Sequence, residues 1–161
     1  MIPRHLGFWF LFLAIFTAPW TAVAEGADVY DEKADAHHDL AAALATAPAS
    51  HKNIVLVFGA NWCADCRALD AQMHNPELAS MIEQNFVLVK INVGRFDKNS
   101  DVCEQYAVPI KNGIPTVAVL DPHGKLLYAM DQGQFADARH MSYESIKAFF
   151  DKWKPGRSGN K

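Results

Sequence analysis

Two cysteines separated by two residues are the feature of this sequence with the most specific chemistry. Cys63 and Cys66 lie in the stretch GANWCADCRALD, directly after Trp62. Such a pair can form a structural disulfide, supply two ligands of a metal site, or exchange disulfides with other thiols. The elements around the pair bear on this choice, because the position of a cysteine on a helix sets the reactivity of its sulfur.

The residues before the pair predict a strand, and those after it predict a helix. Residues 54–58, IVLVF, form a short apolar run typical of a strand buried on both faces. Cys63 would then lie in the first helical turn, where free N–H groups and the helix dipole favour a thiolate. We therefore predict that Cys63 attacks a disulfide and that Cys66, one turn further on, resolves the mixed disulfide. Trp62 would place an apolar ring beside the reactive sulfur.

The metal and structural alternatives fit the residues less well. A zinc site needs four ligands, and the chain has no second pair of closely spaced cysteines. His37 and His38 are adjacent, so they point to different helix faces and are expected to be solvated. A copper site of Cys63, Cys66 and a methionine such as Met141 remains open. A purely structural disulfide would close too small a loop to add much stability. No metal or other cofactor is expected.

The remaining patterns predict a single α/β domain over residues 25–153. Helices are expected at 35–47, where Pro48 would end the element, at 67–73, from Asn75 through Ile82, at 101–106 and at 142–153. Further strands are expected at 86–93, 116–120 and 125–130. The turn DPHG at residues 121–124 should join the last two strands as a hairpin. Alternating strands and helices followed by a hairpin predict a mixed sheet.

The chain ends and the charge bear on location and partners. Residues 1–24 combine Arg4, an apolar run and the small residues Ala22-Val23-Ala24, which is typical of a cleaved signal peptide. Export to a periplasm, or secretion, is therefore expected. Residues 154–161 should form a disordered tail. A net charge of −3 argues against nucleic-acid binding.

Two segments resemble the thioredoxin superfamily. FGANWCADCR resembles its active-site segment, and NGIPTVAVLD, residues 112–121, resembles its second signature. The chain is similar to exported thioredoxin-like proteins and to the C-terminal domain of the transmembrane thiol-disulfide interchange protein. The resemblance implies a thioredoxin fold of four to five strands with an extra N-terminal helix. It also implies a cis Ile114–Pro115 bond facing the cysteine pair, with Trp62, Ile114 and Pro115 contacting substrate.

Charged positions around the pair depart from that pattern. Val57 occupies the position of the buried acid of cytosolic thioredoxin. Asp70, four residues after Cys66, matches an acid of the interchange-protein domain and is predicted to accept a proton from Cys66, the alternative being a solvated surface acid. Asp65 either opposes a thiolate on its neighbours or occupies a merely tolerated variable position. Cys103 is expected to be a small buried hydrophobe, with a third redox role as the alternative.

These observations together predict an exported, monomeric thiol-disulfide oxidoreductase. It would reduce disulfides of exported proteins through Cys63 and Cys66, and a membrane thiol-disulfide donor would re-reduce it. The alternative is a redox-sensitive chaperone or a copper-binding module that uses the pair as ligands.

Overall fold

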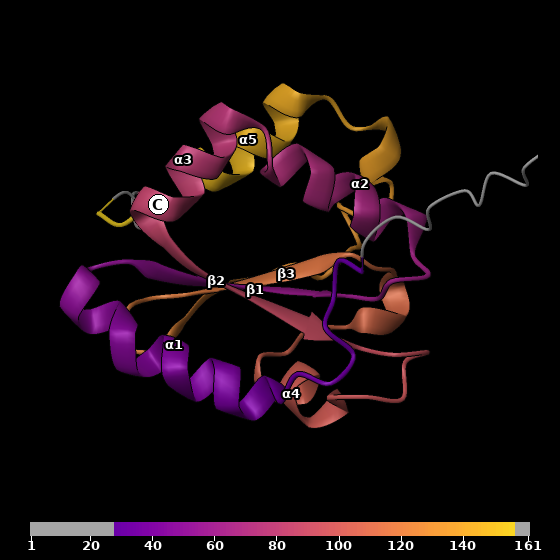
Figure 1. Ribbon diagram of the computed structural model, residues 1–161, viewed down its shortest axis with the longest axis horizontal. Coiled ribbons are helices and arrows are strands. Elements are labelled where there is room, and N and C mark those ends of the chain that lie inside the picture. Colours follow the sequence, from indigo (N-terminus) through magenta and orange to yellow (C-terminus); the bar gives the residue numbers. More distant parts are fainter. Residues whose placement is uncertain (1–27, 157–161) are drawn as a thin grey trace, which may run out of the picture.

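The computed structural model describes residues 28–156. A four-stranded sheet lies between two layers of helices (Figure 1). The predicted signal peptide, residues 1–24, lies outside the described residues, as do residues 157–161 of the predicted tail. No helix of the described part is long and apolar enough to cross a membrane.

The sheet has the order β2-β1-β3-β4 and is mixed, as predicted. The central strand β1 (Asn53–Gly59) pairs in parallel with β2 (Phe86–Asn92) and antiparallel with β3 (Thr116–Leu120). The predicted hairpin is confirmed, because β3 pairs antiparallel with β4 (Leu126–Ala129). Every residue of β1 is buried, which explains its continuous apolar sequence.

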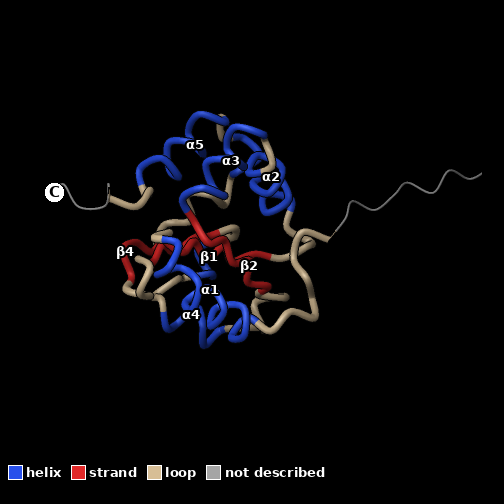
Figure 2. The backbone as a smooth tube through the Cα atoms, turned by 60° about the vertical axis from the view of Figure 1, so that its left-hand side comes forward, coloured by secondary structure: helices blue, strands red, loops and turns tan. Residues whose placement is uncertain are grey.

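Helices cover both faces of the sheet. The helices α1 (Ala36–Ser50) and α4 (Ser100–Gln105) lie on one side, and α2 (Ala64–Met73), α3 (Pro76–Asn85) and α5 (Tyr143–Lys152) lie on the other (Figures 1 and 2). Asn75 caps α3 by accepting a hydrogen bond from the Glu77 amide, so α2 and α3 are separate helices. Two short 3₁₀ helices, η1 (Ile110–Asn112) and η2 (Ala138–His140), were not predicted.

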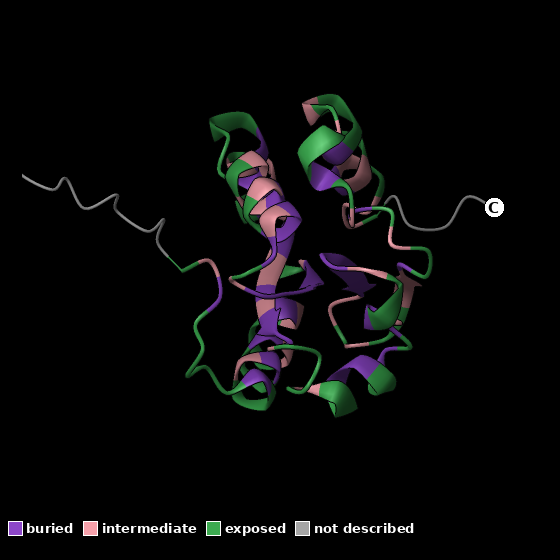
Figure 3. Ribbon diagram, turned by 90° about the vertical axis from the view of Figure 1, so that its right-hand side faces the viewer, coloured by how far each residue is buried: buried purple, intermediate pink, exposed green. Residues whose placement is uncertain are grey.

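The alternation of side chains along β1 divides the core into two parts. Ile54, Leu56 and Phe58 pack with the α1 side, whereas Val55 and Val57 pack with the α3 and α5 side. Figure 3 shows buried residues along the sheet and exposed residues on the outer faces of the helices. Both cysteines of the pair belong to the core on the α1 side.

The prediction that Pro48 ends the first helix is wrong. The helix continues to Ser50, with Pro48 inside it, and ends at His51 in the left-handed conformation. Proline removes one backbone donor, yet α1 runs two residues beyond it. The amides of His51 and Lys52 close that turn by bonding to the carbonyls of Pro48 and Ala47.

Candidate redox site

Cys63 and Cys66 lie where β1 leads into α2 and are joined by a disulfide. Cys63 is the N-cap of α2, and its sulfur accepts a hydrogen bond of 3.0 Å from the Cys66 amide. Cys63 is 5% exposed, and Cys66 is 1% exposed. This arrangement places the helix N-terminus at the sulfur of Cys63 and leaves the sulfur of Cys66 in the core.

The loop before β3 brings Ile114 and Pro115 to the pair. The Ile114–Pro115 peptide bond is cis. The carbonyl oxygen of Ile114 lies 3.4 Å from Cys63 Sγ, although 51 residues separate them along the chain. Asn112 supports this loop because its side-chain amide donates to the Asp131 carbonyl oxygen at 2.8 Å. The second sequence signature therefore adjoins the first in space.

Trp62 forms an exposed aromatic surface beside Cys63. Its side chain is 49% exposed, and its indole N–H donates to the Gly94 carbonyl oxygen at 2.8 Å. The ring of Phe96 meets the indole edge-on, with centroids 5.8 Å apart. Phe96 is 43% exposed, so Trp62 and Phe96, which come from different loops, together form an exposed aromatic surface. No pattern in the sequence marked Phe96, which occupies a polar loop.

Asp70 is not a freely solvated acid. Its side chain is 16% exposed, and its carboxylate pairs with the Lys90 ammonium group from β2. His74 lies 3.4 Å from the other carboxylate oxygen. The sequence contained Lys90 within a predicted strand, but no spacing linked it to Asp70. The parallel pairing of β1 with β2 sets the position of Lys90 beneath α2.

Asp65 is buried and paired with a cation. Its carboxylate accepts hydrogen bonds from the Arg139 backbone N–H and from Arg139 Nε, both at 3.1 Å. Burial alone raises the pKa of Asp65, but the hydrogen bonds and charge of Arg139 outweigh it and hold the pKa below its usual range. Arg139 thereby offsets much of the negative charge that was expected to oppose a thiolate at Cys63. No sequence pattern connected these two residues, which are 74 positions apart.

Asn61, before the cysteine pair, and Arg67, directly after it, bond to each other across the active-site turn, which comprises residues 61–67. The Arg67 guanidinium donates to the Asn61 carbonyl oxygen, and Asn61 uses its side chain to bind the backbone of Tyr30. Tyr30 belongs to residues 28–34, which precede α1 and are called here the N-terminal segment. No motif in the sequence pointed to a role for this segment.

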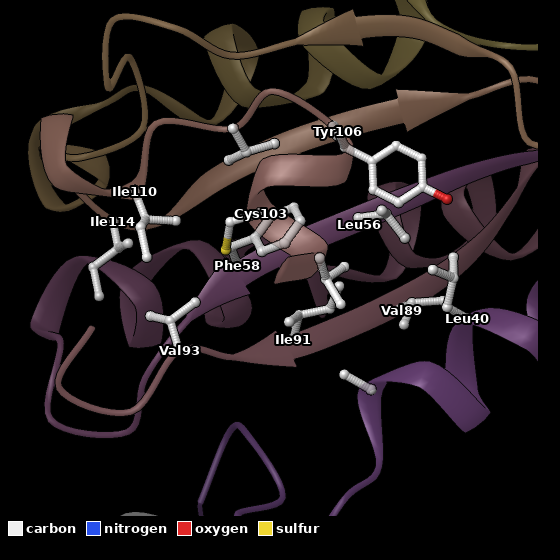
Figure 4. Close-up of a cluster of buried hydrophobic side chains, with 14 of the residues drawn as sticks. Leu40, Leu56, Phe58, Val89, Ile91, Val93, Cys103, Tyr106, Ile110 and Ile114 are labelled. Carbon is white, nitrogen blue, oxygen red and sulfur yellow. The ribbon is translucent and has the colours of Figure 1, made fainter. Parts of the chain in front are cut away.

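Cys103 lies in the core on the α1 side with Phe58 and Ile110 (Figure 4). It carries a free thiol and is buried. Burial, followed by the charge of Asp101, raises the pKa of this thiol to about 11. These properties are those of the small buried hydrophobe that the sequence suggested.

Of the candidate metal ligands, Cys63 and Cys66 are paired with each other in a disulfide. Between residues 28 and 156 no three His, Cys, Asp or Glu side chains form a group able to hold a metal ion. Met141 packs against the core on the α3 and α5 side, whereas Cys63 and Cys66 belong to the other core. His37 instead pairs with Asp101 at 2.9 Å, and both side chains are exposed.

Comparison with known proteins agrees with this geometry. Residues 35–122 match the model of a family described as thioredoxin-like. That range covers more than half of the sequence, and the chain belongs to the thioredoxin-like family. The matched range begins just before α1 and ends after β3, so it contains both cysteines and Pro115.

Solved structures extend the similarity. A disulphide isomerase from Xylella fastidiosa Temecula1 is 46% identical, with a TM-score of 0.75, over 77% of this chain and 95% of that chain. The reduced C-terminal domain of DsbD from Neisseria meningitidis is 22% identical, with a TM-score of 0.53, over 73% of this chain and 96% of that domain, and it supports the fold alone.

A curated relative matches a smaller region. Probable nucleoredoxin 3 from Oryza sativa subsp. japonica is 31% identical over 94 residues, which is 47% of this chain. The match spans only 20% of that protein's length. The fold, the Cys63–Cys66 disulfide and the similarity to a disulphide isomerase together support a thiol-disulfide oxidoreductase.

Proposed function

We propose that this protein is an exported thiol-disulfide oxidoreductase that reduces disulfides of other exported proteins. The observation that carries the proposal is the placement of Cys63 Sγ at the N-terminus of α2, with the Cys66 amide donating to it. A thiolate at this position gains a hydrogen bond and the field of the helix dipole. The disulphide isomerase of 46% identity supports protein disulfides as the substrate class.

The proposed reaction has two exchange steps. The Cys63 thiolate attacks a substrate disulfide, a bond forms between Cys63 and one substrate sulfur, and the other substrate sulfur leaves as a thiolate. Cys66 then attacks Cys63, which closes the Cys63–Cys66 disulfide and releases the second substrate thiolate. A dithiol donor, such as a membrane thiol-disulfide protein, must supply two electrons to reopen the disulfide.

Substrate contacts would come from the residues around Cys63. The Ile114 carbonyl oxygen near Cys63 Sγ can accept a hydrogen bond from an extended substrate backbone. Pro115 follows in the same loop, and Trp62, next to Cys63 in the sequence, supplies an exposed ring. We assign Trp62, Ile114 and Pro115 to substrate binding on these grounds.

Asp70 is proposed to take the proton that Cys66 loses before the second step. It lies one helical turn beyond Cys66 and is largely shielded from solvent. Lys90 holds its carboxylate in place by the ion pair. Asp70 thereby takes the role of the buried acid of cytosolic thioredoxin, whose position is occupied by Val57 in this chain.

Asp70→Asn is expected to slow resolution of the mixed disulfide by roughly 10- to 100-fold near neutral pH, because the amide cannot accept the proton. The rate is measured by stopped-flow release of the second chromophoric thiolate after mixing reduced protein with an aromatic disulfide. Lys90→Met serves as the comparison, since it leaves the carboxylate able to accept a proton. An equal slowing in both variants would assign Asp70 a structural role instead.

The direction of electron flow is tested by the reduction potential. No cation lies between the cysteines, so we expect a reducing protein nearer −270 mV, roughly the value of thioredoxin, than −120 mV, roughly that of a strong oxidant. Equilibration with glutathione gives the value, and alkylation after acid quenching and denaturation counts the thiols, with Cys103 adding one thiol in both redox states. A potential above about −180 mV would contradict the reductant assignment and favour an isomerase or oxidase.

A further inference from the structure

The N-terminal segment brings one buried tyrosine to the sulfur of Cys66. A Cβ atom placed on Gly59 would lie 2.3 Å from the Tyr30 hydroxyl oxygen and 2.9 Å from Cys66 Sγ. The hydroxyl and the sulfur therefore share the small space above the Gly59 Cα atom. Tyr30 is only 2% exposed, so its hydroxyl lies in the interior beside the more buried cysteine.

The position of Tyr30 is held by several contacts. The Asn61 side chain accepts from the Tyr30 N–H at 2.8 Å and donates to the Tyr30 carbonyl oxygen at 2.9 Å. Lys90 donates to the Val29 carbonyl oxygen at 3.3 Å and also pairs with Asp70. Figure 1 shows the segment, in indigo, leading from the level of the sheet down to α1. It is thus tied both to the active-site turn and to the ion pair beneath α2.

We propose that the Tyr30 hydroxyl donates a hydrogen bond to the Cys66 thiolate and thereby acts as a catalytic residue in resolution of the mixed disulfide. The inference rests on the proposed function and deepens it. When Cys63 is bonded to a substrate sulfur, Cys66 Sγ is free of Cys63 and lies in a buried environment that disfavours its charge. A neighbouring hydroxyl stabilises that charge and raises the fraction of thiolate.

The step balances without a further reactant. Cys66 loses its proton to the Asp70 carboxylate, its thiolate attacks Cys63 Sγ, and the substrate thiolate leaves and takes up a proton from water. Tyr30 keeps its own proton throughout. Burial, followed by the charge of Asp70, raises the pKa of Tyr30, which keeps the hydroxyl a donor at physiological pH.

The ionisable groups around this space come from three elements. Asp70 on α2 and Lys90 on β2 form the ion pair, and Glu32 of the N-terminal segment lies 3.5 Å from the Asn61 side-chain amide. Asp65 is directed away to Arg139. Tyr30→Phe leaves all of these charges in place, so a change in pH profile in this variant reports the hydroxyl.

The experiment mixes reduced protein with an excess of an aromatic disulfide that releases a coloured thiolate. Release is biphasic, because Cys63 attack gives the first thiolate and Cys66 resolution gives the second. In Tyr30→Phe we expect an unchanged first phase and a second phase slowed about 10-fold near pH 7, the range of a hydrogen bond to a charged group. The slowing should become smaller as the pH is raised, because ionisation of Cys66 then depends less on the hydroxyl.

The matched control is Tyr106→Phe. Tyr106 is also buried in the core on the α1 side, but its hydroxyl accepts from the Gln105 side chain. This variant should show both phases at the wild-type rate. An unchanged second phase in Tyr30→Phe, or one slowed equally at every pH, would overturn the inference. Wild-type protein without a second phase would instead contradict the proposed function.

Discussion

Cys66→Ser is expected to abolish catalytic turnover while leaving Cys63 able to attack. A serine hydroxyl is not ionised at neutral pH and does not displace a thiolate from a disulfide, so the mixed disulfide persists. Turnover of a protein disulfide should fall by at least about 10³-fold, because the step that releases the substrate is lost. Long-lived mixed disulfides should accumulate with exported proteins and be visible on non-reducing gels.

Two further cysteine variants test the assigned roles. Cys63→Ser should trap far less partner, because Cys66 is 1% exposed and reaches external disulfides poorly. Cys103→Ala should retain turnover, since that thiol is buried and takes no part in the disulfide. Equal trapping by Cys63→Ser and Cys66→Ser, or trapping by neither, would refute the order of attack and resolution.

Gly59→Ala is expected to destabilise the fold and disturb the redox site together. The added methyl group would meet the Tyr30 hydroxyl oxygen at 2.3 Å and its ring carbon at 2.6 Å, both shorter than real contacts. Neither the ring nor Cys66 can move freely, because both are buried. Overpacking of this kind costs about 1–3 kcal/mol, measurable by denaturant unfolding of the oxidised protein.

A double-mutant cycle identifies the cause of this loss. In a Tyr30→Ala background the space beside Gly59 is vacated, so Gly59→Ala should cost much less there than in the wild type. The coupling between the two positions should be about 1 kcal/mol or more. Additive effects would show that the methyl group is accommodated elsewhere and that Tyr30 does not fill this space.

The order of the elements could be predicted from the sequence because each depends on local patterns. Residues 116–120 were predicted as a strand and form β3 with those bounds, since a short β-branched run between turn residues allows few other structures. The position of Cys63 at the start of a helix followed from the strand and turn before it. Pro48 was misjudged, because tertiary packing of Leu40, Ala43 and Ala47 carries α1 past a residue that normally ends a helix.

The chemistry of the pair was likewise contained in its spacing, whereas its electrostatic environment was decided by tertiary structure. Two cysteines one helical turn apart can form a disulfide wherever that helix lies. The charged partners of the two nearby acids come from distant segments. Lys90 of β2 pairs with Asp70, and Arg139 of η2 pairs with Asp65. The Tyr30 ring and the Cys66 sulfur both fit beside Gly59 because that residue has no side chain. Such contacts depend on how the helices, the sheet and the N-terminal segment pack together, and no periodicity in the sequence encodes that packing.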